Sequence, residues 1–337
     1  MTKVSGPLII NLDSTALSNH ETNLLTENIV GGVILFDHNY SNKKQIKSLI
    51  SSIKSIKNDI LVAVDHEGGR VQRFKNNFTM LPSFSDIGIL YLSDNKLADE
   101  IAYNSGYIAG YELAEIGIDI NFSPVIDLTS NSRVLYGRTF SSSYEIIIRL
   151  ASKYIEGLLD NGVLPTLKHF PGHGAVPSDT HTDVSTCDLS YEDLTQHISP
   201  FKYLHGIYNI PIMTSHVIYN SVSDSPVTVS SKWLSNLSES IFKSKPFFVS
   251  DDLEMGAIVN NIRGKSKLEI LNQSLINGCN MVIVTTMQNR ELIDNKISYK
   301  FYKNEYIENH IEIINEKFYN IDLPSIENIT YNKRDAR

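Results

Sequence analysis

The stretch GVLPTLKHF, residues 162–170, points most directly to the fold. It starts as a short apolar run and ends in Lys168 and His169. It leads into KHFPGHGAVPSDTH (168–181), which holds three histidines, a lysine and an aspartate. A packed core cannot accommodate so many polar groups without partners. The stretch therefore predicts a buried strand whose carboxyl end opens into a functional loop.

Seven other apolar runs share this design and end in polar or glycine-rich sequence. Continuous runs rich in Val and Ile are typical of strands that are buried on both faces of a parallel sheet. The runs are PLIINLD (7–13), GGVILF (31–36), ILVAVDHEGG (60–69), GIDINFSPV (117–125), NIPIMTSH (209–216), KPFFVSDDL (245–253) and CNMVIVTT (279–286).

Helical patterns lie between these runs, at 96–117, 143–162 and 267–279, and two of them stop at Gly117 and Gly162. Eight strands that alternate with helices predict an α/β fold, a single (β/α)8 TIM-type barrel, with allowance for irregular first strands. A doubly wound sheet is the alternative, but it would carry a glycine-rich phosphate loop after its first strand. The sequence there is NLDSTALSN. We expect one catalytic domain over residues 1–337, with the barrel at about 7–300 and a tail after it.

Composition excludes several classes of protein. The chain has 337 residues and a formal net charge of −8, without the Lys/Arg cluster of a nucleic-acid-binding surface. No segment approaches the roughly 20 apolar residues of a membrane span. Two cysteines form no disulfide framework, and the N-terminal apolar run is too short for a signal peptide. We expect a cytoplasmic protein, monomeric, without nucleic-acid or membrane partners.

Reactive side chains collect where the predicted strands end, which is where barrel enzymes build their sites. Taken singly, each has a structural explanation; Asp65 and Asp252, for example, could be helix caps. Their occurrence on one rim favours a site. They are Asp65, His66, Glu67, Arg70, Arg73, Arg133, Arg138, Lys168, His169, Ser215, His216, Asp251 and Asp252.

Three reaction classes could use this rim. A metal hydrolase could use His169 and His173, completed by Asp179, His181 and His216, although Pro171 and Gly172 disfavour an i, i+4 pair on a helix. A Schiff-base enzyme could use Lys168. A glycoside hydrolase could use Asp251 as the nucleophile, with Asp179 orienting and charging His181 for proton transfer.

Three segments favour the glycoside hydrolase. VDHEGGRVQRF, KHFPGHGAVPSDTH and SDDLEMGA resemble, in order and spacing, the signatures of family 3 glycoside hydrolases. The resemblance spans about residues 7–285 and is to the β-N-acetylglucosaminidase branch that acts in bacterial cell-wall recycling. It implies hydrolysis, with retention, of terminal N-acetylglucosamine from 1,6-anhydro-N-acetylmuramic acid, with or without a peptide. Some relatives also cleave chitooligosaccharides, and a sugar-binding barrel without catalysis is the non-enzymatic alternative.

The resemblance also implies roles for single residues. Asp251 matches the nucleophile, His181 the acid/base and Asp179 its partner. His173 and His216 match positions near the site. No metal or other cofactor is implied, and the partner is a small muropeptide. The sugar-binding positions are Asp65, Arg73, Arg138, Lys168 and His169.

The sequence departs from the family pattern at three places. His66 stands where glutamine is common, Thr180 stands where serine is usual, and LEMGA after Asp251 is one residue shorter than the usual form. These changes leave the catalytic set intact and bear on substrate preference.

Overall fold

The computed structural model describes residues 6–129, 134–176, 185–256, 258 and 265–285. Asp179, Thr180 and His181 lie outside this part of the chain, as do Arg133 and everything after residue 285. No helix in the described ranges combines the length and apolar character that crossing a membrane requires.

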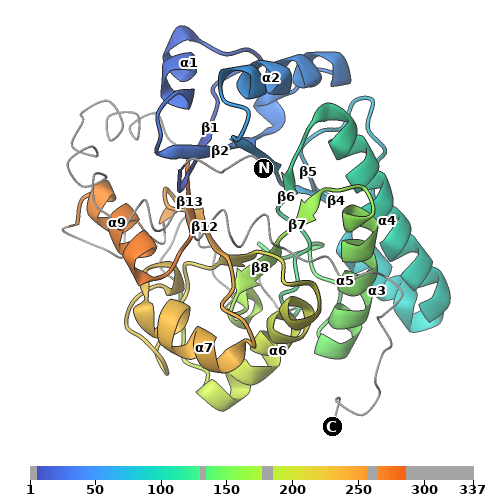
Figure 1. The fold of residues 1–337 in the computed structure, drawn as a ribbon. Helices are drawn as coiled ribbons and strands as arrows, with labels where there is room; N and C mark the ends of the chain where they lie inside the picture. Colours follow the sequence, from blue (N-terminus) through green and yellow to red (C-terminus); the bar gives the residue numbers. More distant parts are fainter. Residues whose placement is uncertain (1–5, 130–133, 177–184, 257, 259–264, 286–337) are drawn as a thin grey trace.

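A parallel sheet of nine strands forms the centre of the molecule (Figure 1). All eight predicted strands are present, and the predicted run at 162–170 supplies two of the nine. The strands are β1 (Leu8–Asn11), β2 (Val30–Leu35), β3 (Leu61–Val64), β6 (Ile120–Asn121), β7 (Leu164–Pro165), β8 (Leu167–Phe170), β10 (Ile212–Thr214), β12 (Phe248–Asp252) and β13 (Met281–Val284).

The order of the strands closes the sheet into a barrel. It runs β7-β6-β3-β2-β1-β13-β12-β10-β8, so the two ends of the order are consecutive segments of the chain. Strand β7 pairs with β6 and β8 pairs with β10, with only Thr166 between them. The predicted TIM-type barrel is therefore confirmed, and the doubly wound sheet is excluded because an open sheet has two separate edges.

Two small sheets lie beside the barrel. An antiparallel pair, β4 (His66–Gly68) and β5 (Val71–Gln72), follows β3 directly. Strand β9 (Thr186–Cys187) pairs in parallel with β11 (Ile218–Tyr219). The β4–β5 turn matters for function, because it keeps the residues after Asp65 at the carboxyl end of the barrel.

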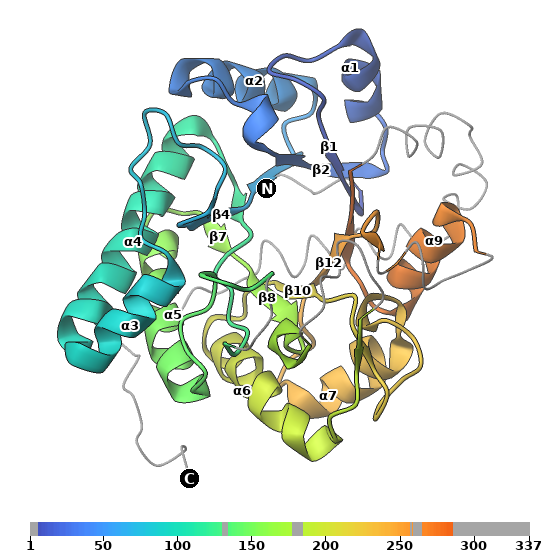
Figure 2. The ribbon, with the colours of Figure 1, turned by 180° about the vertical axis from the view of Figure 1, so that it is seen from behind.

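Helices surround the barrel, and α3, α4 and α5 pack together on one side of it (Figure 2). The predicted helices begin at polar caps, Asp94 for α4, Ser143 for α5 and Ser266 for α9. Gly117 ends α4 with a φ of 94°, which only glycine adopts without strain. The helices are α1 (Asn19–Leu25), α2 (Lys43–Ile56), α3 (Phe84–Ser93), α4 (Asn95–Ile116), α5 (Tyr144–Leu159), α6 (Tyr191–Tyr208), α7 (Ser238–Ile241) and α9 (Lys267–Asn277).

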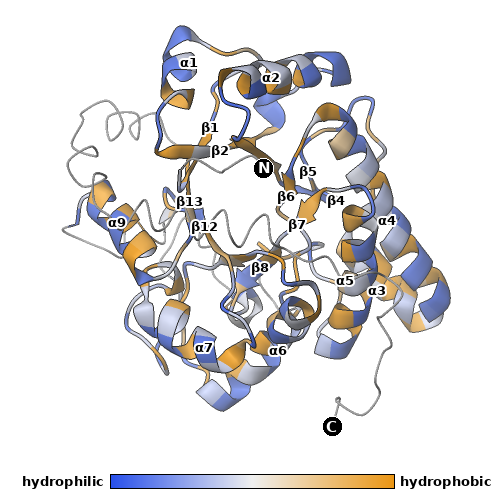
Figure 3. Cartoon of the chain, in the orientation of Figure 1, coloured by the Kyte–Doolittle hydropathy of each residue, from blue (hydrophilic) through white to orange (hydrophobic). Residues whose placement is uncertain are grey.

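Strand residues alternate between two apolar cores. In β1, Ile9 belongs to the cluster that also holds Met213 and Met281, while Leu8 and Ile10 belong to the cluster under the helices. This alternation follows from the two-residue period of a strand. Figure 3 shows the strands largely hydrophobic and the outer helices with hydrophilic faces. The apolar runs are therefore explained by burial on both faces of the sheet.

Candidate active site

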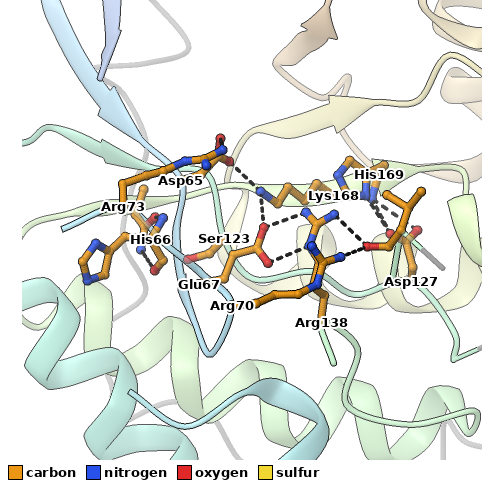
Figure 4. A network of polar contacts seen from close by, with 12 residues as sticks. Asp65, His66, Glu67, Arg70, Arg73, Ser123, Asp127, Arg138, Lys168 and His169 are labelled. Atoms are coloured by element: carbon orange, nitrogen blue, oxygen red, sulfur yellow. Dashed lines mark hydrogen bonds and ion pairs between the residues drawn. The ribbon is translucent and has the colours of Figure 1, made fainter. Parts of the chain in front are cut away.

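Parallel strands place their carboxyl ends on one rim, and the predicted site residues gather there. Asp65 follows β3, Lys168 and His169 lie in β8, and Asp251 lies in β12. Lys168 occupies the middle of a network of ion pairs (Figure 4). The side chain of Lys168 is only 2% exposed, so these pairs are made away from water.

Two carboxylates hold the ammonium group of Lys168. Its Nζ lies 2.7 Å from Asp65 Oδ1 and 2.7 Å from Glu67 Oε1. Both contacts use Lys168 as a cation, whereas a Schiff-base lysine attacks as a neutral amine. The surroundings of Lys168 therefore argue against Schiff-base chemistry and assign it an electrostatic role.

Glu67, a rim residue to which the sequence assigned no role, is a member of the network. Arg138 binds it through two hydrogen bonds, Nε to Oε2 at 2.9 Å and Nη2 to Oε1 at 2.7 Å. Burial alone would raise the pKa of Glu67, but Arg138 and Lys168 together hold this pKa well below its usual range. Glu67 also raises the pKa of Arg138 despite its burial. The pair is thus ionised, and Glu67 uses two of the five N–H donors of Arg138.

Arg73 differs from the other two predicted sugar-binding cations. Its Nη2 is 3.6 Å from Asp65 Oδ2, and its guanidinium lies 5.3 Å from the centroid of the Phe36 ring. Its Nε is buried and has no hydrogen-bond partner among the described residues. The network thus contains two carboxylates, Asp65 and Glu67, as well as the three cations. The charges of the cations are therefore partly neutralised within the site. Arg73 keeps the most donor capacity.

His66 lies between Asp65 and Glu67 in the sequence and stands where the family commonly has glutamine. It is fully buried and packs against Phe74 and Phe78. Burial lowers the pKa of His66 to about 3, so the ring is neutral. Its backbone is held on both sides by Asn121, which accepts from His66 N and donates to His66 O at 2.9 Å each. The His66 ring therefore acts in packing, and its peptide fixes the spacing of the carboxylates.

His169 binds a second buried carboxylate, Asp127, which the sequence pattern also did not reveal. The distance from His169 Nδ1 to Asp127 Oδ2 is 2.7 Å, and the backbone N of His173 donates to Asp127 Oδ1 at 2.7 Å. Asp127 lies two residues beyond Val125, which bridges to Lys168. A carboxylate just after a strand end was the only available indication.

Asp251 and Asp252 end strand β12. Asp251 Oδ1 accepts a hydrogen bond from Asp252 N at 2.8 Å, and its charge acts on His173. Burial raises the pKa of Asp252 to about 6, and its side chain accepts from Glu254 N and Thr285 Oγ1. Asp252 thus accepts a hydrogen bond from the turn after β12, whereas Asp65 forms ion pairs. Asp251 remains the candidate nucleophile.

The histidines of the metal-hydrolase alternative have other partners. Burial lowers the pKa of His173 to about 4, so its ring is neutral, and it stands 5.9 Å from that of His169 in an edge-on contact. His216 lies 2.8 Å from both Thr228 Oγ1 and the backbone oxygen of Asp252. Over the ranges that the structure describes, no three His, Cys, Asp or Glu residues form a group that could hold a metal.

Comparisons with known proteins agree with this geometry. The family model "Glycosyl hydrolase family 3 N terminal domain" matches residues 4–315. A beta-hexosaminidase of Psychromonas ingrahamii is 39% identical over 253 residues, 74% of this chain and 74% of that protein. One of Tolumonas auensis is 37% identical over 282 residues, 82% of each.

A solved structure extends the likeness to the fold. NagZ from Neisseria gonorrhoeae, in complex with N-trifluoroacetyl-D-glucosamine, has a TM-score of 0.79 and 33% identity. The match covers 87% of this chain and 84% of that one. The resemblance found in the sequence is thereby confirmed. The chain belongs to glycosyl hydrolase family 3, and it is a glycoside hydrolase of the β-N-acetylhexosaminidase class.

Proposed function

We propose that this chain is a retaining exo-β-N-acetylglucosaminidase that acts on small peptidoglycan fragments. The substrate would be N-acetylglucosamine linked to 1,6-anhydro-N-acetylmuramic acid, with or without a peptide. The observation that carries the proposal is the buried network around Lys168, on the same rim as the carboxylate of Asp251. We further propose a monomeric, single-domain enzyme in the cytoplasm; its cysteines are free and buried, as suits a reducing compartment.

The network offers fixed polar groups to the non-reducing sugar. Asp65 can accept hydrogen bonds from hydroxyls, and Arg73 can donate them. Lys168 and Arg138 would also hold the carboxylates in place, because Lys168 uses two of its three donors on Asp65 and Glu67, and Arg138 uses two of its five on Glu67. Preference for an N-acetyl sugar is supported by the relative from Neisseria gonorrhoeae, whose structure holds N-trifluoroacetyl-D-glucosamine.

The reaction would run in two steps. Asp251 attacks the anomeric carbon while His181 gives a proton to the departing oxygen, which forms a glycosyl ester and releases the second sugar. His181 then takes a proton from water, and the water displaces Asp251, so the β configuration is retained. Asp179 would orient His181 and favour its charged form. No step requires a metal or another cofactor.

The experiment compares an aryl N-acetyl-β-glucosaminide with the matching aryl β-glucoside. Release of phenol from the first alone supports the proposal, and equal release from both indicates a broader β-glycosidase. Rates on the anhydromuramyl disaccharide and on chitobiose then separate the peptidoglycan substrate from chitooligosaccharides. The Asp251→Asn protein is the control for contaminating activity, and failure of the wild type on every substrate would leave only a sugar-binding barrel.

A further inference from the structure

Asp127 is buried beneath the rim, and the loop that follows β8 is tied to it. The residue has 0% of its surface exposed. It accepts hydrogen bonds from the backbone N of His173 at 2.7 Å and from the backbone N of His169 at 3.2 and 3.3 Å. Its Oδ2 also lies 2.7 Å from His169 Nδ1 (Figure 4). One carboxylate therefore contacts both the backbone and the ring of a predicted sugar-binding residue.

These contacts determine which nitrogen of His169 carries the proton. Both oxygens of Asp127 accept backbone N–H groups, Oδ1 from His173 N and from His169 N and Oδ2 from His169 N, as an ionised carboxylate does. An ionised carboxylate only accepts hydrogen bonds, so Nδ1 of His169 must be the donor. In the neutral ring, Nε2 then carries no hydrogen and is an acceptor. In the described part of the chain, the ring of His169 hydrogen-bonds to Asp127 through Nδ1 and to no other residue.

We propose that Asp127 is a positioning residue, which holds His169 in the Nδ1-protonated form and so presents Nε2 as an acceptor to a sugar hydroxyl. The inference rests on the proposed function, in which His169 contacts the sugar. Arg73 and Lys168 can only donate hydrogen bonds and Asp65 accepts them after β3, so Nε2 would add a second acceptor at β8, where the site could bind another hydroxyl as a donor. A site built to bind a hydroxyl strongly rejects analogues that lack it.

The first test is the Asp127→Asn variant, studied by nitrogen NMR of the imidazole rings. The amide oxygen can keep the bond to His173 N, and its NH₂ group then faces His169 Nδ1 and moves the ring proton to Nε2. The opposite orientation of the amide is disfavoured, because its NH₂ group would then face the backbone N–H of His173, and both groups are donors. We expect the ring proton on Nδ1 in the wild type and on Nε2 in the variant. An Nε2–H ring in the wild type would overturn the proposal without any variant.

Kinetics provide the second test. We expect kcat/KM on the aryl N-acetyl-β-glucosaminide to fall about 10–100-fold in Asp127→Asn, the range found for groups that orient a metal-bound histidine. A series of substrates that each lack one hydroxyl locates the contact. One of them should react much more slowly with the wild type, and this penalty should shrink in the variant. Unchanged penalties for the whole series would refute the contact.

Asp119→Asn is the matched control. Asp119 also binds a backbone N–H, that of Val62 at 2.7 Å, and a cation, Lys54 at 2.6 Å. It lies just before β6, at the opposite end of the barrel from the rim. We expect the tautomer of His169 and kcat/KM to stay as in the wild type. If the wild type cleaves no glucosaminide, the proposed function fails, and the NMR result still tests Asp127 alone.

Discussion

Replacement of Glu67 by glutamine tests the ionic network most directly. Glu67 is 2% exposed and carries the only negative charge that Arg138 binds in the described part of the chain, at 2.7 Å. Glutamine keeps the size of the side chain but removes the negative charge that Arg138 binds directly. Breaking a buried pair in this way costs roughly 3–5 kcal/mol. We therefore expect the free energy of unfolding, from urea titration at pH 7, to fall by this amount.

The stabilisation by Glu67 should depend on pH, and its direction follows from the pKa of this carboxyl. In the unfolded chain Glu67 has a pKa of about 4.3, and in the folded protein this pKa is much lower. Above pH 4.3 the carboxylate is ionised in both states, and its full stabilisation is present. Below it the unfolded chain takes up a proton, so the wild type loses about 1.4 kcal/mol per pH unit relative to Glu67→Gln. The stability difference should narrow as pH falls.

Asp99→Asn provides the comparison. Arg149 also binds Asp99 through two nitrogens, with Nη2 2.7 Å from Asp99 Oδ2 and Nε bonded to Oδ1. The side chain of Arg149, however, is 41% exposed. An exposed pair contributes only about 0–1 kcal/mol. Equal losses in the two variants, or a Glu67→Gln difference that stays constant from pH 6 to pH 3.5, would show that the buried network does not stabilise the fold as argued.

Three further outcomes are expected from the proposed mechanism. Asp251→Ala should remove nearly all activity without unfolding, and proton NMR of the wild-type reaction should show the β anomer first; an α product would exclude a glycosyl-enzyme. His181→Ala should slow the disaccharide by ~10²–10⁴-fold, much more than an activated aryl glycoside, and give a burst of phenolate, with Asp179→Asn milder; equal slowing without a burst would make the histidine structural. Exhaustive chelation should leave turnover unchanged, and a loss that zinc restores would favour the metal hydrolase.

The barrel could be predicted because its signals are local. The composition of each apolar run is enough to predict that the strand is buried on both faces. Gly117 and Gly162 adopt the positive φ that ends a helical pattern. The rim also follows, since parallel strands must end together. The split of 162–170 into two strands was not predictable, because it depends on which neighbours pair with each half.

The partners within the site could not be predicted. Arg138 and Glu67 are 71 residues apart, and nothing near either one indicates that they meet. The same holds for Asp127 and His169, 42 residues apart. The sequence therefore indicates Asp65 and three cations as sugar-binding residues, and only the packed barrel shows that Glu67 binds two of these cations. Asp179 and His181 stay predictions.

The junction between β7 and β8 divides the molecule into two parts of nearly equal length. Asp65 and Glu67 belong to the first part, and Lys168 and Asp251 belong to the second. Lys168 reaches Asp65 across 103 residues of chain, so this ion pair exists only when the two parts are in contact. Neither part holds a complete site. A chain cut at Thr166 would be inactive until its fragments joined again, which would make glucosaminidase activity a direct measure of their reassembly.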